Sequence, residues 1–118
     1  MEVIGERARQ LPAPQHVVWD DLVHPRTGGP RSWLLLLDDE VEPRILAADR
    51  PDRVVWSSLW PNRPDDEVHL SLAPAGGGTL LRFRLQTPDG LPDASRTGHL
   101  RRRLNQLLFG DLRAAYGQ

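Results

Sequence analysis

Residues 67–87 read EVHLSLAPAGGGTLLRFRLQT, and this stretch decides the fold. Apolar and polar side chains alternate along 67–74 and again along 79–87, with Ala75 and three glycines between the two runs. Alternation on both sides of a short turn predicts an antiparallel pair of β-strands with one apolar and one solvated face. Residues 93–116 then predict a single long helix. We expect this helix to lie across the apolar face of the sheet and, if the sheet curves, to enclose a pocket with it.

The predicted helix at 93–116 is amphipathic, and its apolar stripe is wide enough to cover a sheet. The apolar side contains Leu100, Leu104, Leu107, Leu108, Leu112 and Ala115. The polar side contains Arg101, Arg102, Arg103, Asn105, Gln106 and Arg113, which predicts an exposed face rich in arginine. Gly110 lies inside the helix, where a close approach to the sheet is one reason for a glycine, and Gly117 fits a C-terminal cap.

The first part of the chain predicts one strand and one short helix. Residues 3–11 alternate imperfectly and predict a strand, which Pro12 and Pro14 end. A short helix is expected next, because Val18 and Leu22 share a helical face.

The middle of the chain predicts two further strands. Residues 41–48 predict a strand at the edge of the sheet, because Pro43 near its start has no N–H for the ladder. Residues 53–60, RVVWSSLW, predict a strong strand within an antiparallel meander. Between the first helix and these strands, residues 32–37 are an apolar run without a period, which fits a short helix and a buried strand equally.

The composition predicts one globular domain, residues 1–118, and excludes several functions. The chain has no Cys, which leaves no thiolate metal site or thiol nucleophile and makes the reducing cytoplasm the expected compartment. All 15 basic residues are Arg, so Schiff-base and P-loop lysine chemistry are excluded. The formal charge of −1 gives no reason to expect nucleic acid as a partner. No apolar run approaches the roughly 20 residues of a membrane span, and the acidic N-terminus predicts no signal peptide.

The order of these elements, together with three short motifs, resembles the START-like or SRPBCC superfamily, which includes polyketide cyclase-like and activator-of-chaperone-ATPase-like proteins. The motifs are LPAPQHVVW at 11–19, RVVWSS at 53–58 and the GGT hairpin at 77–79. The resemblance implies an α+β helix-grip fold, in which a curved antiparallel sheet wraps around the C-terminal helix over an apolar cavity. It also implies the binding of apolar molecules, with cyclisation or dehydration catalysed by some members. No catalytic residue carries over to this sequence.

The four Trp residues are the feature that most suggests a ligand. Trp33, Trp56 and Trp60 offer flat apolar area and an indole N–H for a bound molecule, but they equally fill the core of a small domain. We predict that a small apolar or amphipathic ligand binds between sheet and helix. The predicted lining residues are Trp33, Trp56, Ser58, Leu70, Phe83 and Leu85 from the sheet side, with Leu104 and Leu108 from the helix.

Two other functions stay open at this point. A cyclase-like or dehydratase-like enzyme needs a buried polar group aimed into the cavity, for which Ser58 and His99 are the first candidates. An interaction module, with a collapsed cavity and Trp side chains at a partner or homodimer surface, is the third hypothesis. We expect no cofactor and no metal. The histidines lack ligand spacing, and the acidic triplets at 38–40 and 65–67 fit solvated turns better than a cation site.

Overall fold

The computed structural model describes residues 1–117, and nine elements succeed one another along the chain. They are β1 (Glu2–Leu11), α1 (Gln15–Val23), β2 (Ile45–Asp49), β3 (Arg53–Ser57), β4 (Glu67–Ala75), β5 (Gly78–Thr87), α2 (Ala94–Gln106), the π-helical turn η1 (Leu107–Leu112) and α3 (Arg113–Ala115).

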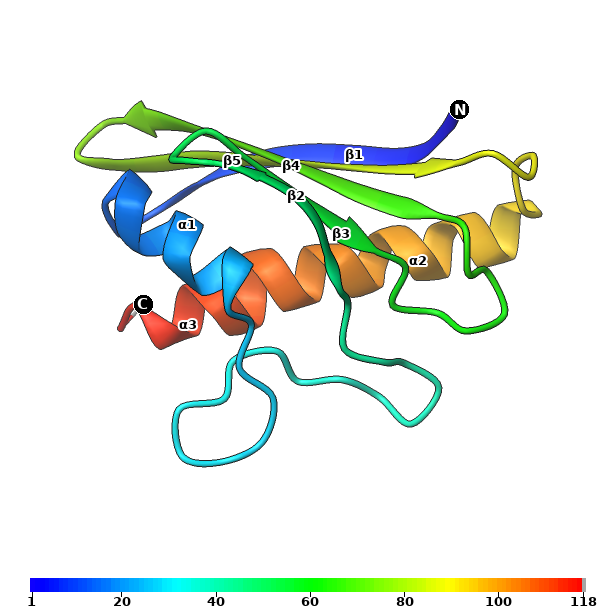
Figure 1. Ribbon diagram of the computed structural model, residues 1–118, viewed down its shortest axis with the longest axis horizontal. Coiled ribbons are helices and arrows are strands. Elements are labelled where there is room, and N and C mark those ends of the chain that lie inside the picture. Colours follow the sequence, from blue (N-terminus) through cyan, green and yellow to red (C-terminus); the bar gives the residue numbers. More distant parts are fainter. Residues whose placement is uncertain (118) are drawn as a thin grey trace.

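The strands form one five-stranded antiparallel sheet in the order β1-β5-β4-β3-β2. Strands β2 to β5 form a meander, and the last of them, β5, also pairs with the N-terminal strand β1. Register shifts between Val3 and Gly5 in β1 and between Ile45 and Ala47 in β2 mark bulges, which bend a strand and increase its twist. The helical run from α2 to α3 crosses one face of this curved sheet (Figure 1). The predicted α+β helix-grip fold is therefore confirmed.

The hairpin of β4 and β5 forms where the sequence predicted it. Its loop is the two residues Gly76 and Gly77, since Ala75 and Gly78 already pair across the strands. Both loop glycines have positive φ, 53° and 81°, as a type I′ turn requires. Glycine adopts this conformation without steric penalty. The turn therefore sets the alternation that points Leu81, Phe83 and Leu85 toward the helix.

The long helix begins at a side-chain cap and contains one widened turn. Asp93 accepts a hydrogen bond from the Arg96 amide at 2.8 Å, which satisfies one free N–H of the first turn. The π-turn η1 holds one more residue per turn than an α-helix. As a result Phe109 is buried beside its neighbours, whereas Ala115, predicted on the apolar side, is exposed.

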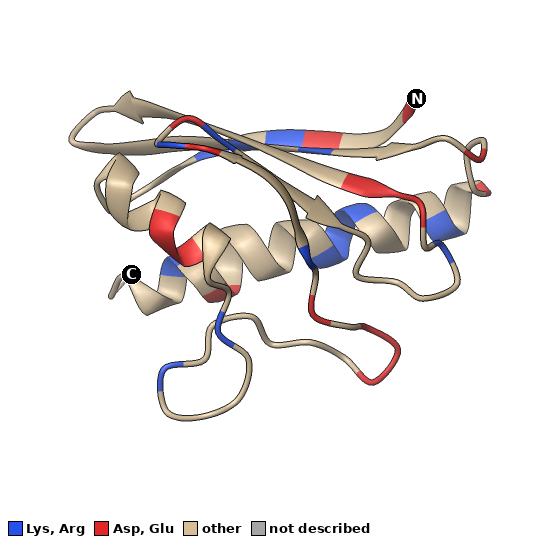
Figure 2. Ribbon diagram, viewed as in Figure 1, with Lys and Arg blue, Asp and Glu red and all other residues tan. Residues whose placement is uncertain are grey.

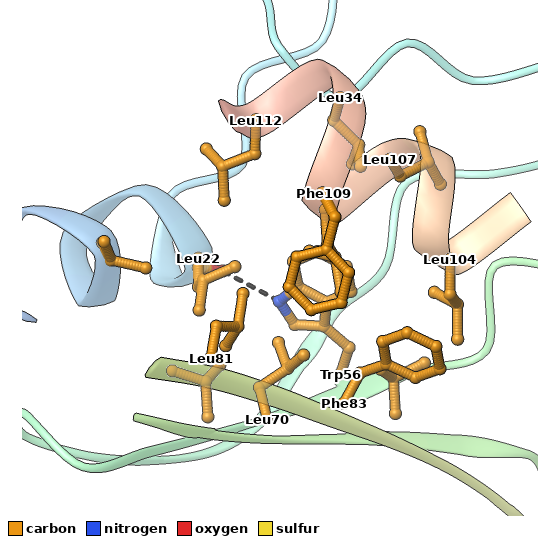
Figure 3. Close-up of a cluster of buried hydrophobic side chains, with 14 of the residues drawn as sticks. Leu22, Leu34, Trp56, Leu70, Leu81, Phe83, Leu104, Leu107, Phe109 and Leu112 are labelled. Carbon is orange, nitrogen blue, oxygen red and sulfur yellow. Dashed lines mark hydrogen bonds between the residues drawn. The ribbon is translucent and has the colours of Figure 1, made fainter. Parts of the chain in front are cut away.

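The core lies between the inner face of the sheet and the helices, and its buried residues form one connected cluster. Figure 3 shows Phe109 of η1 above Trp56 of β3, with Phe83 of β5 beside them. The rings of Phe83 and Phe109 are 5.9 Å apart, and the Trp56 indole donates a 2.8 Å hydrogen bond to the Leu22 carbonyl of α1. Each fully buried side chain of this size contributes about 1.5–3 kcal/mol.

The segment between α1 and β2 differs from the prediction. Residues 32–37 form neither a helix nor a strand, although Trp33 and Leu34 are buried. In Figure 1 this long connection (cyan) passes along the side of α2 that faces away from the sheet. The apolar side chains of this run pack against the core although the segment is not a strand of the sheet. Such packing does not require a regular backbone.

Two strands are shorter than predicted. β2 is an edge strand, as expected, but it begins at Ile45 because the Arg44 amide bonds to the Ser57 hydroxyl at 2.7 Å. β3 ends at Ser57 because the chain then turns: the Ser58 hydroxyl accepts from the Trp60 amide at 3.0 Å. Within residues 1–117, no helix is both long and apolar enough to cross a membrane.

Candidate functional site

The residues predicted to line a ligand pocket all lie at the junction of sheet, connection and helix. They are buried, and seven of them belong to the connected core cluster. Trp33 stacks on Trp56 with ring centroids 6.2 Å apart, and the Trp33 indole N–H is buried without a hydrogen-bond partner in residues 1–117. Ligand contact at these positions stays a prediction. Reaching the inner ones requires sheet and helix to separate.

The two candidates for catalysis lie apart. Ser58 is held in a local turn, where its hydroxyl accepts from the Trp60 amide and donates to the Trp60 carbonyl at 3.2 Å. His99 lies on α2 and borders an open hollow together with Asp39 and Asp93. Ser58 borders a different hollow, beside Val41 and Pro61. The structure therefore does not bring the two side chains together.

A buried ion pair joins the connection to α2. Arg103, predicted to be exposed, has a side chain only 7% exposed, and that of Glu40 is fully buried. The Arg103 guanidinium donates two hydrogen bonds to the Glu40 carboxylate, Nε to Oε2 at 2.8 Å and Nη2 to Oε1 at 2.7 Å. This bidentate geometry is the strong form of the arginine–carboxylate contact.

The remaining polar atoms of this pair also have partners. Arg103 donates to the carbonyl of Leu35 at 3.1 Å, and Glu40 accepts from the Trp60 indole at 3.2 Å and from the Leu37 amide at 2.9 Å. Burial alone raises the pKa of Glu40, but the hydrogen bonds from Arg103 and Leu37 outweigh it and hold that pKa below its ordinary value. The hydrogen bond to Glu40 raises the pKa of Arg103. Together these contacts fasten the connection onto the helix.

One hollow on the described residues opens between β1 and α2. It has a volume of about 250 Å³ and is lined by Glu6, Arg7, Phe83, Gly98, Arg101, Arg102 and Asn105. The buried Phe83 is the one predicted pocket residue among these lining residues. Figure 2 shows the basic turn of α2 below the sheet and charged residues along β1.

Two of the arginines around this hollow occupy space that is free because the residue opposite is a glycine. Gly5 of β1 is buried, and a Cβ on it would overlap Cγ and Cδ of Arg101. The aliphatic stem of Arg101 therefore lies directly on the β1 backbone. A Cβ on Gly98 would lie 3.1 Å from Nη1 of Arg102, so the second guanidinium also occupies space that a glycine leaves free.

Asn105 supplies a polar group without a partner at the same place. Its Oδ1 is buried and has no hydrogen-bond partner in residues 1–117. A buried acceptor left unpaired in this way costs about 1–3 kcal/mol. A hollow lined by an asparagine, a buried aromatic residue and several arginines can hold a small molecule with polar and apolar parts. Across residues 1–117, no three side chains of His, Asp and Glu gather as metal ligands.

Comparison with solved structures places this geometry in a known fold. CalU16 from Micromonospora echinospora superposes with a TM-score of 0.62 and 23% identity, covering 89% of this chain and 71% of that one. The Aha1 dimer from Colwellia psychrerythraea gives 0.65 and 14% over 92% of both chains. An AHSA1-like protein from Rhizobium etli gives 0.63 and 21% over 97% of this chain and 82% of the other.

The fold is the START-like helix-grip fold. At these identities the likeness shows the fold alone, and no protein-family model and no curated protein matches the sequence. In a helix-grip fold the sheet wraps around the last helix, and the hollow between β1 and α2 lies where the two meet. The Aha1 protein from Colwellia psychrerythraea is a dimer, whereas a homodimer of this chain stays a prediction.

Proposed function

We propose that the protein binds a small amphipathic molecule in the hollow between β1 and α2. The observation that carries the proposal is that Asn105, whose Oδ1 has no hydrogen-bond partner in residues 1–117, and the buried Phe83 both line that hollow. Once the Asn105 side chain turns toward the hollow, a ligand hydroxyl or N–H donates to its amide oxygen, while the apolar body of the ligand lies against the phenylalanine. The START-like fold supports this function, since it is a ligand-binding fold.

The size of the hollow limits the ligand. Its volume of about 250 Å³ lies just below the roughly 300–1,000 Å³ of pockets for drug-sized molecules. A molecule with one or two rings, or a short chain, fits this space. None of the other predicted lining residues borders this hollow, and Ser58 borders a different one. A larger ligand reaches them only if α2 moves away from the sheet.

A substitution that fills the hollow tests the proposal. Gly98→Leu places a large side chain among the lining residues, and leucine also has a higher helix propensity than glycine. Gly110→Leu is the matched control, because Gly110 lies on the exposed side of the same helical run.

The measurement is titration calorimetry with small amphipathic probes. The probes have naphthalene, phenylpropane or octane bodies, and each body ends in an alcohol, a primary amide or a carboxylate. We expect binding to the unsubstituted protein and to Gly110→Leu, and its loss in Gly98→Leu. Equal binding by all three proteins, or binding by none of them, contradicts the proposal.

A further inference from the structure

We infer that the ligand carries a carboxylate, and that Arg7 and Arg101 bind it at the mouth of the hollow. This inference rests on the proposed function and specifies the chemical class of its ligand: a small organic acid with an apolar body. Its basis is the charge of the lining residues, the placement of their side chains and the partners that they lack.

The charges around the hollow do not balance. Three of the lining residues are arginines and one, Glu6, is acidic. The Glu6 carboxylate is already engaged, since its Oε2 accepts from Nε of Arg84 at 2.8 Å and its Oε1 lies 3.8 Å from Arg82. Within residues 1–117, Arg7, Arg101 and Arg102 make no hydrogen bond or ion pair through their guanidinium groups. The mouth of the hollow therefore has an excess of positive charge.

The Arg101 side chain is better placed to bind a ligand than a freely rotating surface arginine would be. Its stem is confined between α2 and the backbone at Gly5, so part of the rotamer entropy that a binding event removes is already lost on folding. On β1, Arg7 pairs in register with Phe83, which puts it on the inner face of the sheet next to the aromatic wall. When the ligand carboxylate lies at the two guanidinium groups, the apolar body of the ligand therefore lies beside Phe83.

The third arginine is shared with another surface. Arg102 also borders the open hollow that contains Asp39, Asp93 and His99. These acidic neighbours partly offset its charge, so we assign the carboxylate to Arg7 and Arg101. A planar carboxylate suits arginine because each guanidinium presents two parallel N–H groups to its two oxygens.

Matched acids and amides test the inference. The naphthalene, phenylpropane and octane probes are compared as carboxylates and as primary amides, which have nearly the same shape without the charge. We expect the acids to bind about tenfold more tightly than the amides, the effect of one charge-assisted hydrogen bond. Added salt should weaken only the binding of the acids.

Substitution of the two arginines provides the second arm. Arg7→Gln and Arg101→Gln should each weaken the acids about tenfold and leave the amides unchanged. Arg101→Lys, which keeps the charge and loses the planar fork, should recover part of this loss. Arg31→Gln, at an exposed position of the connection, is the control for net charge and should change neither class.

The outcomes separate the two claims. Equal binding of acids and amides, with no effect of Arg7→Gln or Arg101→Gln, overturns the carboxylate inference and leaves the proposed function standing. Binding of neither class to the unsubstituted protein overturns both. Arginine substitutions that weaken acids and amides alike also overturn the inference, because they indicate a structural role for these side chains.

Discussion

At the scale of single residues, the ion pair of Arg103 and Glu40 is the contact most dependent on its exact partners. Removing one member of a buried pair leaves the other charged and unpaired, which typically costs about 3–5 kcal/mol. The pair therefore fixes the position of the connection on α2. Its net contribution to the free energy of unfolding is small, but the loss of one partner is costly. Replacing one partner reveals how much the fold depends on it.

We predict that Glu40→Gln lowers the free energy of unfolding by about 3 kcal/mol, because Arg103 then remains buried without a counter-charge. Chemical denaturation monitored by Trp fluorescence measures this change. Glu42→Gln, two residues away and exposed, is the control and should shift the free energy by less than about 0.5 kcal/mol. Equal stability of the two variants contradicts the assigned role of the pair.

The same carboxylate predicts a dependence of stability on pH. The pKa of Glu40 is lower in the folded protein than its ordinary value of 4.5, so the unfolded chain takes up a proton first as the pH falls. The stability from Glu40 is present above pH 4.5 and is lost as the pH falls below that value toward the folded pKa. We expect the difference in unfolding free energy between the unsubstituted protein and Glu40→Gln to shrink over that range. A difference that is constant or grows there contradicts this linkage.

Part of this pair was predictable. Arg103 lies three residues after Leu100 and four before Leu107, so helical spacing places it on the apolar stripe among the leucines. The run of three arginines concealed that position. Glu40 had no comparable signal, because it lies 63 residues from Arg103 and resembles its solvated neighbours Asp38 and Asp39. Long-range pairing of this kind is fixed only by the tertiary fold.

At the scale of elements, the π-turn η1 explains most of the difference between the predicted and observed helix. Its extra residue changes which side chains face the sheet after Leu108. Phe109 becomes buried, and Tyr116 rather than Ala115 lies against α1, where its hydroxyl donates to Asp21 at 2.7 Å. A periodicity of 3.6 residues carries no signal for such a turn. The helix limits and the earlier leucines, which depend on period and capping alone, were predicted correctly.

Gly110 lies within this turn but is not needed for close packing, contrary to the sequence-based expectation. It is exposed, and a Cβ on it would meet only Cγ of Gln106, at 3.9 Å. We predict that Gly110→Ala raises the free energy of unfolding by about 0.5–1 kcal/mol, since alanine loses less backbone entropy on folding. Thermal denaturation followed by circular dichroism checks this.

Gly5→Ala is the matched comparison for that substitution. Its Cβ would overlap the stem of Arg101, so this variant should be destabilised. Stabilisation of both variants contradicts the packing described at the hollow.

At the scale of the whole molecule, the fold could be predicted from the sequence, whereas the hollow between β1 and α2 could not. The alternation in β4 and β5, the diglycine turn and the long helix each predict their own geometry locally, and together they require a helix across a sheet. The hollow depends instead on Arg7 of β1 and Arg101 of α2 lining the same space, and on Gly5 lying opposite the Arg101 side chain. No local pattern in the sequence reports such an arrangement.

The central claim is that a small molecule binds between β1 and α2 in a START-like fold. The most direct measurement is a map of amide chemical-shift changes in ¹⁵N-labelled protein during titration with 2-naphthoate. We expect the largest changes in residues 5–7 and 98–105, smaller ones at Phe83, and none of them in Gly98→Leu. Changes confined to the outer face of the sheet, around His69 and Arg84, or a spectrum that does not respond, would contradict the account.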